Sequence, residues 1–210
     1  LPDLPRMESL REALRRARAE GTGASMVFAF GLHLNPEMPD LELDTVRRLV
    51  RAYALLEDAL RRIADVDLSR RVAPFIVPFP EAYVTLVADP DYRPDMPALI
   101  DDFVRHNPTR DRSLDMLPLL ASIDADRVLP RVERPDLVKP RPAPHYRLPD
   151  CRIDDPDWRI ATEWNRWVSV ERLADDPERL DALGREYLDR PKPTFAPNDA
   201  WIQKTRSLIE

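Results

Sequence analysis

The chain has 210 residues, of which 43% are hydrophobic and 33% charged, a composition that suits one globular domain with a sizeable core. Its net charge of −6 argues against a general nucleic-acid binder, and the sequence has neither an apolar run long enough to span a membrane nor a signal-peptide pattern. The single cysteine, Cys151, excludes an internal disulfide and fits a reducing cytoplasm, which is the predicted location.

Apolar periodicity predicts two helices and a strand in the first third of the chain. The helices span residues 5–20 and 44–65, and the arginines of the second, Arg51 among them, are predicted to face solvent. Residues 26–34 are apolar apart from Gly31 and His33, which favours a buried strand.

Two polar side chains, His33 and Asn35, lie near the end of this strand. Residues two apart on a strand point to the same face, so the strand presents an imidazole beside a carboxamide. The alternative is a core strand whose histidine bonds a backbone partner.

Short helices are predicted over residues 81–87, 95–106 and 114–121, the last with a kink at Pro118. A connector broken by five prolines follows at 130–144.

The next predicted strand, residues 143–148, places His145 and Arg147 on one face and Tyr146 on the other. Three further helices are predicted over residues 158–174, 177–188 and 198–210. In the first of these, Glu163 and Arg166 are spaced to pair, and Trp164 and Trp167 are predicted to be core residues.

Two clusters of arginines occur in predicted loops. Arg70 and Arg71 follow Ser69, and Arg110 and Arg112 lie in the polar stretch 107–112. Guanidinium groups beside an open sheet face would attract phosphate or carboxylate. The alternatives are solvated surface charge for Arg70 and Arg71, and loop-holding pairs with Asp111 or Asp115 for Arg110 and Arg112.

Several common motifs are absent. The sequence contains no Gly-rich phosphate loop, no Rossmann fingerprint, no zinc-ligand spacing and no Gly-x-Ser-x-Gly turn. Cys151 has no evident base near it in the sequence, so a nucleophilic role is disfavoured.

The order of four short motifs resembles the putative amidoligase family. Gly31-Leu32-His33-Leu34-Asn35 is similar to the family's Gly-Leu-His-x-His segment, and Ser69-Arg70-Arg71 to its Ser-Arg-Arg. Residues 143–149 occupy the place of its late Glu-Phe-Arg strand, and residues 1–16 resemble the run after its Glu-Leu-Val-x-Pro-Pro-Leu strand. The likeness covers residues 1 to about 175.

The resemblance implies a carboxylate–amine ligase of the glutamine synthetase and glutamate–cysteine ligase type. The expected fold is α+β, with a curved antiparallel sheet, helices packed on one face and a glutamine synthetase-like catalytic arrangement. Residues 1–175 would form this domain and residues 176–210 a C-terminal helical appendage. Because the chain begins Leu1-Pro2 and lacks the family's early Glu-bearing strands, we expect it to start inside a longer chain.

The expected activity is ATP-dependent amide-bond formation through an acyl phosphate, with Mg²⁺, on a small amino acid or peptide, as in bacterial-type amidoligases. A monomer and a homo-oligomer both remain open. The roles that the resemblance implies are catalysis by His33, His145 and Arg147, cofactor binding by Arg70, Arg71, Arg110 and Arg112, and metal binding by His33 and Asn35.

Two departures from the family pattern keep other readings open. Asn35 replaces the second histidine, and His145 replaces the glutamate of Glu-Phe-Arg, so the site is poor in carboxylates for Mg²⁺. One alternative is a non-catalytic ligase-like domain that binds a peptide, a nucleotide or a protein partner. Another is a metal-dependent hydrolase that uses His33 and His145.

Overall fold

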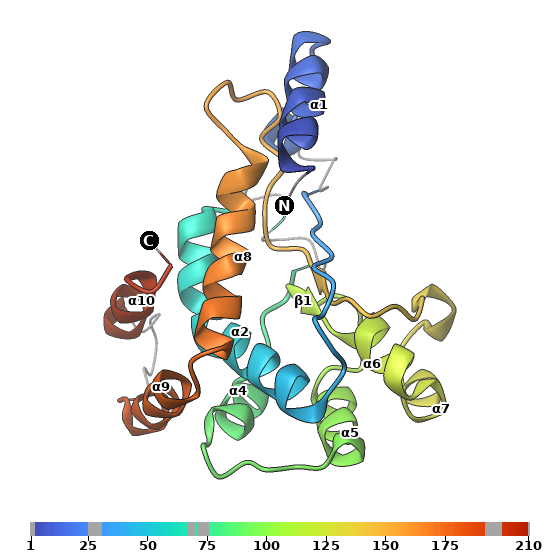
Figure 1. The fold of residues 1–210 in the computed structure, drawn as a ribbon, viewed down its shortest axis with the longest axis vertical. Coiled ribbons are helices and arrows are strands. Elements are labelled where there is room, and N and C mark those ends of the chain that lie inside the picture. Colours follow the sequence, from blue (N-terminus) through green and yellow to red (C-terminus); the bar gives the residue numbers. More distant parts are fainter. Residues whose placement is uncertain (1–2, 25–30, 67–69, 71–75, 192–198, 210) are drawn as a thin grey trace.

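The computed structural model describes residues 3–24, 31–66, 70, 76–191 and 199–209, and helices make up most of these ranges (Figure 1). The central helix is α2 (Leu43–Ala64). The other helices are α1 (Leu4–Arg16), α4 (Glu81–Ala88), α5 (Met96–His106), α6 (Leu117–Ile123), α7 (Ala125–Val128), α8 (Ile160–Ala174), α9 (Pro177–Asp189) and α10 (Asp199–Arg206), with short 3-10 turns at Thr22–Ala24, Leu129–Arg131 and Pro135–Leu137.

The core forms around α2. Asp44 in its first turn complements the positive end of the helix dipole, and Asp65 follows the last turn in the left-handed conformation, with φ of 44°. Helices α4, α8, α9 and α10 all contact α2, so side chains such as Leu55 and Leu56 have no exposed surface. The predicted limits of 44–65 are confirmed to within one residue.

The prediction that Arg51 faces solvent is wrong. Its side chain is only 2% exposed, because α9 covers this side of α2. The guanidinium donates to Asp181 of α9 and to the carbonyl of Ala88, and these acceptors compensate for the loss of hydration. Gly184 permits this approach, since a Cβ there would lie 2.4 Å from Arg51 Nη2.

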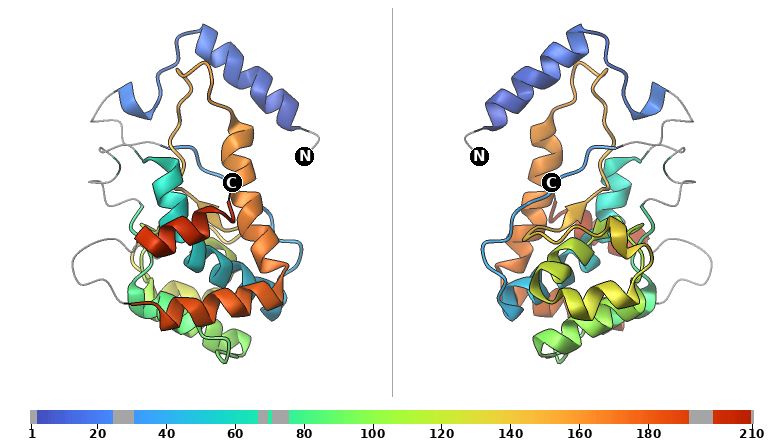
Figure 2. Two further views of the ribbon diagram at one scale, coloured as in Figure 1. Left: turned by 90° about the vertical axis from the view of Figure 1, so that its left-hand side faces the viewer. Right: turned by 90° about the vertical axis from the view of Figure 1, so that its right-hand side faces the viewer.

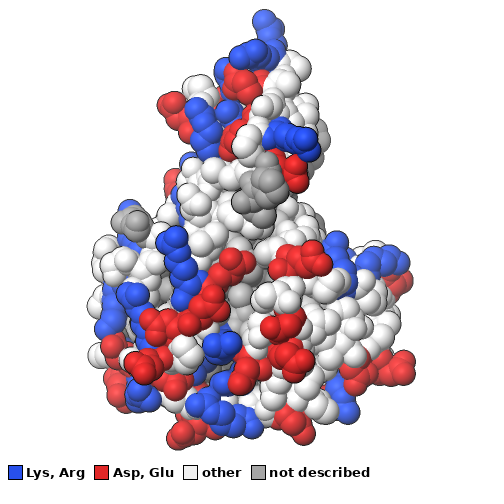
Figure 3. All heavy atoms as spheres, in the orientation of Figure 1, with Lys and Arg blue, Asp and Glu red and all other residues white. Residues whose placement is uncertain are grey.

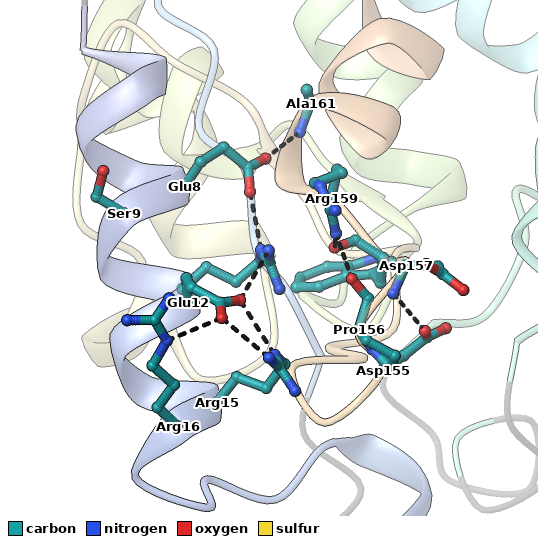
Figure 4. A network of polar contacts seen from close by, with 12 residues as sticks. Glu8, Ser9, Glu12, Arg15, Arg16, Asp155, Pro156, Asp157, Arg159 and Ala161 are labelled. Atoms are coloured by element: carbon teal, nitrogen blue, oxygen red, sulfur yellow. Dashed lines mark hydrogen bonds and ion pairs between the residues drawn. The ribbon is translucent and has the colours of Figure 1, made fainter.

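Helix α1 stands apart from the main body, at the upper end of the molecule in Figures 1 and 2. It is attached to the start of α8, where Glu8 accepts a hydrogen bond from the Ala161 N–H and another from Arg11 (Figure 4). The apolar stripe predicted for this helix is exposed, with Leu10 at 52%, because no other described segment covers it.

Within the part of the chain that the structure describes, the sheet is much smaller than predicted. Strands β1 (Leu114–Asp115) and β2 (His145–Tyr146) pair antiparallel. Isolated bridges add Leu34 antiparallel to β2 and Val77 parallel to Arg112. An α+β fold with a short antiparallel ladder therefore replaces the predicted curved sheet.

Prolines interrupt the backbone ladder between these segments. Pro36 and Pro144 lie beside the Leu34–Tyr146 bridge, Pro149 lies between that bridge and the one of Gly31 with Asp150, and a proline has no N–H to donate to a neighbouring strand. The first part of the predicted strand, residues 25–30, lies outside the described residues.

The helix predicted over residues 114–121 begins later than expected. Residues 114 and 115 pair with β2, and α6 starts at Leu117. Pro118 falls in the first turn, where a missing N–H costs nothing, so it starts the helix and does not kink it.

Helices α9 and α10 pack on α2 and contribute buried side chains, including Leu180 and Trp201, to the same core as the preceding residues. Acidic and basic side chains are interspersed on the face in Figure 3, with uncharged surface between them. None of the helices in the described ranges is long and apolar enough to cross a bilayer.

Candidate functional site

Two segments that are more than a hundred residues apart in the sequence run side by side. Leu34 and Tyr146 exchange both backbone hydrogen bonds at 2.9 Å, and Gly31 pairs with Asp150. The segments around residues 31–38 and 142–151 can be followed together in Figure 1. These bridges place the early and the late segment beside each other.

Alternation along these segments separates polar from apolar side chains. Leu34 and Tyr146 are buried, and the Tyr146 ring packs against Trp167 of α8 at a centroid distance of 5.3 Å. His33 and Asn35 are exposed, and His145 is half-buried. The predicted alternation is confirmed, because one face of each segment is covered by α2 and α8.

The polar faces bring His33 and His145 into contact. Their ring centroids are 4.8 Å apart and the planes meet edge to face at 83°. Nη2 of Arg110 and Nη2 of Arg147 lie 3.4 and 3.3 Å from Nδ1 of His145. Because a guanidinium only donates, Nδ1 must accept, which assigns the proton of the neutral ring to Nε2.

A buried carboxylate lies beneath the two arginines. Asp115 is opposite His145 in the ladder and has no exposed surface. Its Oδ2 accepts from Arg110 Nε at 3.0 Å and from Arg147 Nη2 at 3.2 Å, and Oδ1 accepts from the N–H of Leu117. Burial raises the pKa of Asp115, and the charges of Arg147 and Arg110 oppose that rise.

Both histidines are neutral near pH 7. Partial burial and then the charge of Arg147 lower the pKa of His145 to about 3. His33 keeps solvent access, but desolvation of the rest of its ring, followed by the charges of Arg147, Arg70 and Arg110, lowers its pKa to about 4. The cluster therefore carries guanidinium charge without imidazolium charge.

Some donors around the cluster have no partner among the described residues. Nε of Arg147 and Nε of Arg141 are buried and make no hydrogen bond there. The charge of Arg141 also contributes to the low pKa of His145. A buried donor without a partner costs stability, and because neither Nε has exposed surface, a ligand would contact other atoms of these side chains.

Arg70 is buried and engaged within the protein. Its Nη1 donates to the carbonyls of Leu148 and Pro149 and to Asp150, and its Nη2 donates to the carbonyl of Arg147 at 2.5 Å. The guanidinium lies against the bare Cα of Gly31, where an added Cβ would be 2.5 Å from Cζ. With 2% of its surface exposed, Arg70 braces the strand and is poorly placed for the predicted contact with a cofactor.

The remaining predicted residues are Arg112, Arg71 and Asn35. Arg112 donates to the carbonyls of Pro78 and His106. Arg71 lies outside the described residues. The side chain of Asn35 projects to solvent on the same face as His33.

The donor set suits an anion better than a metal ion. Arginines beside neutral imidazoles match the oxygens of a carboxylate or of the phosphates of ATP. The described residues contain no group of three or more His, Cys, Asp or Glu side chains placed to hold a metal. Asp115 is already bonded to two arginines, so the described residues do not fit the expected Mg²⁺.

Sequence reasoning missed two members of the cluster. Asp115 was considered only as a partner that holds a loop, and Arg141 was not considered. The one available signal for Asp115 was an acidic residue within an otherwise apolar run, Leu114 to Ala121, where a lone charge requires a partner.

The other chemical candidates have structural partners. Glu163 pairs with Arg166 at 2.6 Å and accepts from Trp158 Nε1, as the spacing of the first two predicted. Trp167 is 1% exposed and belongs to the core. Burial raises the pKa of the Cys151 thiol, which disfavours a thiolate nucleophile.

Comparison with known proteins gives one family. The model of the family described as putative amidoligase enzyme matches residues 1–169, which include both segments of the cluster. Comparisons with curated proteins and with solved structures gave no match.

Proposed function

Because the chain belongs to the putative amidoligase family, we propose that it is an ATP-dependent carboxylate–amine ligase whose active site includes the cluster of His33, His145, Arg147, Arg110 and Asp115. The observation that carries the proposal is that the matched region brings these residues together from segments far apart in the sequence. A glutamine synthetase-like arrangement of the catalytic sheet is part of this proposal.

Arg147 and Arg110 are the proposed anion-binding groups. Arg147 and Arg110 are both partly exposed, and both are held by Asp115. Two guanidinium groups fixed in this way stabilise negative charge on a substrate carboxylate or a transferring phosphoryl group without reorganising.

The two imidazoles are proposed to act as uncharged hydrogen-bonding groups. A pKa of about 4 makes His33 a weak base, but it also keeps the ring neutral while an ammonium substrate loses its proton. His33 is the more accessible of the two and is the one proposed to contact the amine.

In the proposed reaction ATP supplies a phosphoryl group to the substrate carboxylate, and ADP leaves. The amine then forms the C–N bond, inorganic phosphate departs, and one proton passes from the amine to solvent or to a neighbouring base. The described residues provide no site for Mg²⁺, so no step is assigned to the metal.

Isotope transfer tests the chemistry directly. We expect the purified protein, given ATP, Mg²⁺, an amino acid labelled with ¹⁸O in its carboxylate and an amine, to release ADP and to move one ¹⁸O into phosphate. Arg147→Lys should lower this activity by about 100-fold, since a lysine cannot keep contact with both Asp115 and the substrate.

Arg105→Lys is the matched control, because Arg105 is exposed and pairs with Asp102 on the same helix, α5. Circular dichroism would verify that each variant is folded. Full activity in folded Arg147→Lys, or the absence of ADP release with every candidate amino acid, would contradict the proposal.

A further inference from the structure

A second hollow lies on the face of the paired segments opposite to the histidines. It has a volume of about 300 Å³ and is enclosed by residues 36–39, the first turns of α2 and the last turns of α8. Trp167, which packs against Tyr146, forms part of its wall. The pocket is at the small end of the range for ligand sites and suits a molecule of roughly ten non-hydrogen atoms.

The floor of the pocket is apolar. Met38, Leu49, Trp167 and Ala174 line it and are otherwise buried in the core. These side chains belong to α2, to α8 and to the chain segment that leaves the small sheet. An occupant therefore needs an apolar body.

Carboxylates surround this floor. Glu171 is fixed in the wall because its Oε1 accepts from the indole Nε1 of Trp167 at 2.6 Å, and Asp175 and Glu37 also line the pocket. The pocket lies at the C-terminal end of α8, where the helix dipole adds negative potential. Arg48 is the opposing charge, and its Nε donates to the carbonyl of Asp44 at 3.3 Å.

These carboxylates do not form a metal site. The described residues include no group of three or more acidic, His or Cys side chains placed to hold a metal ion. The pocket has three carboxylates and one guanidinium, so its net charge is negative. A ligand that combines an organic cation with an apolar body fits both this charge and the apolar floor.

We propose that this pocket binds a small primary amine with an apolar body, its ring or chain on Trp167 and Met38 and its ammonium group beside Glu171 and Asp175. The site is distinct from the arginine cluster, which favours anions and lies on the other face of β2. The proposal does not depend on ligase activity.

Titration with three probes of one shape tests the charge preference. The probes are phenethylamine, L-phenylalanine and hydrocinnamate, added to ¹⁵N-labelled protein at pH 7.5 while the indole N–H signals are followed by NMR. We expect phenethylamine to shift the Trp167 signal with a millimolar or tighter dissociation constant. L-phenylalanine should bind more weakly, and hydrocinnamate should not bind.

Single charge removals locate the ammonium site. Glu171→Gln keeps an acceptor for Trp167 but removes a charge, and we expect it to weaken phenethylamine about five-fold, as should Asp175→Asn. Glu178→Gln, an exposed change on α9 outside the pocket, is the matched control and should leave binding unchanged.

Asp175 is exposed, so its replacement keeps the test valid even where Glu171→Gln disturbs packing. Hydrocinnamate or L-phenylalanine binding as tightly as the amine would overturn the proposal. An unchanged dissociation constant in Asp175→Asn, or no Trp167 shift with phenethylamine, would also overturn it.

Discussion

Arg70 and Arg147 lie beside the same short strand, and they use their donors in opposite ways. Arg70 is 2% exposed and directs its Nη atoms at three carbonyls and Asp150. Arg147 shares Asp115 with Arg110 and leaves its buried Nε without a partner among the described residues. The Nη atoms of Arg70 are thus directed at protein acceptors, whereas Arg147 keeps part of its surface exposed and is the better placed of the two to contact a ligand.

The largest effect that follows from this difference is on stability. Arg70→Ala would leave Asp150 and three carbonyls without this donor, and we expect it to lower the free energy of unfolding by about 4 kcal/mol. Urea denaturation measures the loss. Gly31→Ala should cause part of the same loss, because its Cβ would displace the guanidinium.

Arg105→Ala, which breaks an exposed pair on α5, serves as the control and should cost no more than about 0.5 kcal/mol. A loss below about 1.5 kcal/mol for Arg70→Ala would end the contrast between the two arginines, since Arg70 would then not be a structural brace.

A second prediction concerns the support behind Arg147. The backbone N–H of Arg147 donates to the carbonyl of Ser113, and the Ser113 hydroxyl donates to Glu57 of α2. Burial raises the pKa of Glu57 to about 7, so the carboxyl is neutral in the folded state at pH values where the unfolded chain is ionised. Its contribution to stability is complete below about pH 4.5 and is lost as the pH rises to 7.

Glu57→Gln should remove that loss. The free energy of unfolding of the variant should rise relative to the wild type by about 3 kcal/mol between pH 4.5 and 7.5. Denaturation at several pH values measures it, with Glu178→Gln as a flat reference. A constant difference across that range would show that Glu57 ionises normally in the fold.

His145, on the face that carries Arg147, should change the pH dependence of the free energy of unfolding in the opposite direction and by a smaller amount. The pKa of His145 is lowered to about 3, so its contribution to stability is present above the unfolded value of about 6.5 and is lost as the pH falls below it. Because His145 is half-buried, we expect a loss of about 2 kcal/mol between pH 6.5 and 3 relative to His145→Gln.

Titration of the histidine by NMR provides an independent measurement. A measured pKa near 6.5 for His145 would show that solvent screens the charges of the surrounding arginines. It would contradict the electrostatic part of the comparison between Arg147 and Arg70.

The smallest effect is predicted for Asn35. Its side chain is exposed and sits on the face of the cluster, but the described residues around it form no metal site. Asn35→Ala should change the free energy of unfolding by less than about 0.5 kcal/mol and the rate of ADP release by less than about two-fold. A shift in the Mg²⁺ dependence of that rate would restore the metal role inferred from the family pattern.

The periodic features of the sequence determined much of the fold. The limits of α2 follow from its broad apolar face, and the alternating exposure of Leu34 and His33 follows from strand geometry. The short length of the regular ladder could not be predicted from apolar content, because prolines within the paired segments interrupt its hydrogen bonds.

The candidate site was predictable in its members and less so in their roles. The order of the motifs identified His33, His145 and Arg147, but it did not distinguish Arg70 from Arg147. The partners of buried arginines are remote, at 80 residues for Arg70 with Asp150 and 130 for Arg51 with Asp181. No local pattern records such a pairing, so burial of a charge emerges only from the fold.

The pairing of Leu34 with Tyr146 makes the site sensitive to a single inserted residue. One extra residue between His33 and Leu34 would turn His33 toward the face of Trp167 and would turn an apolar side chain out toward Arg147. Neighbouring prolines leave little slack to absorb the change. Insertions should therefore be tolerated much less well here than in the 3-10 turns between α7 and β2, because those turns connect elements and do not determine which side chains face the site.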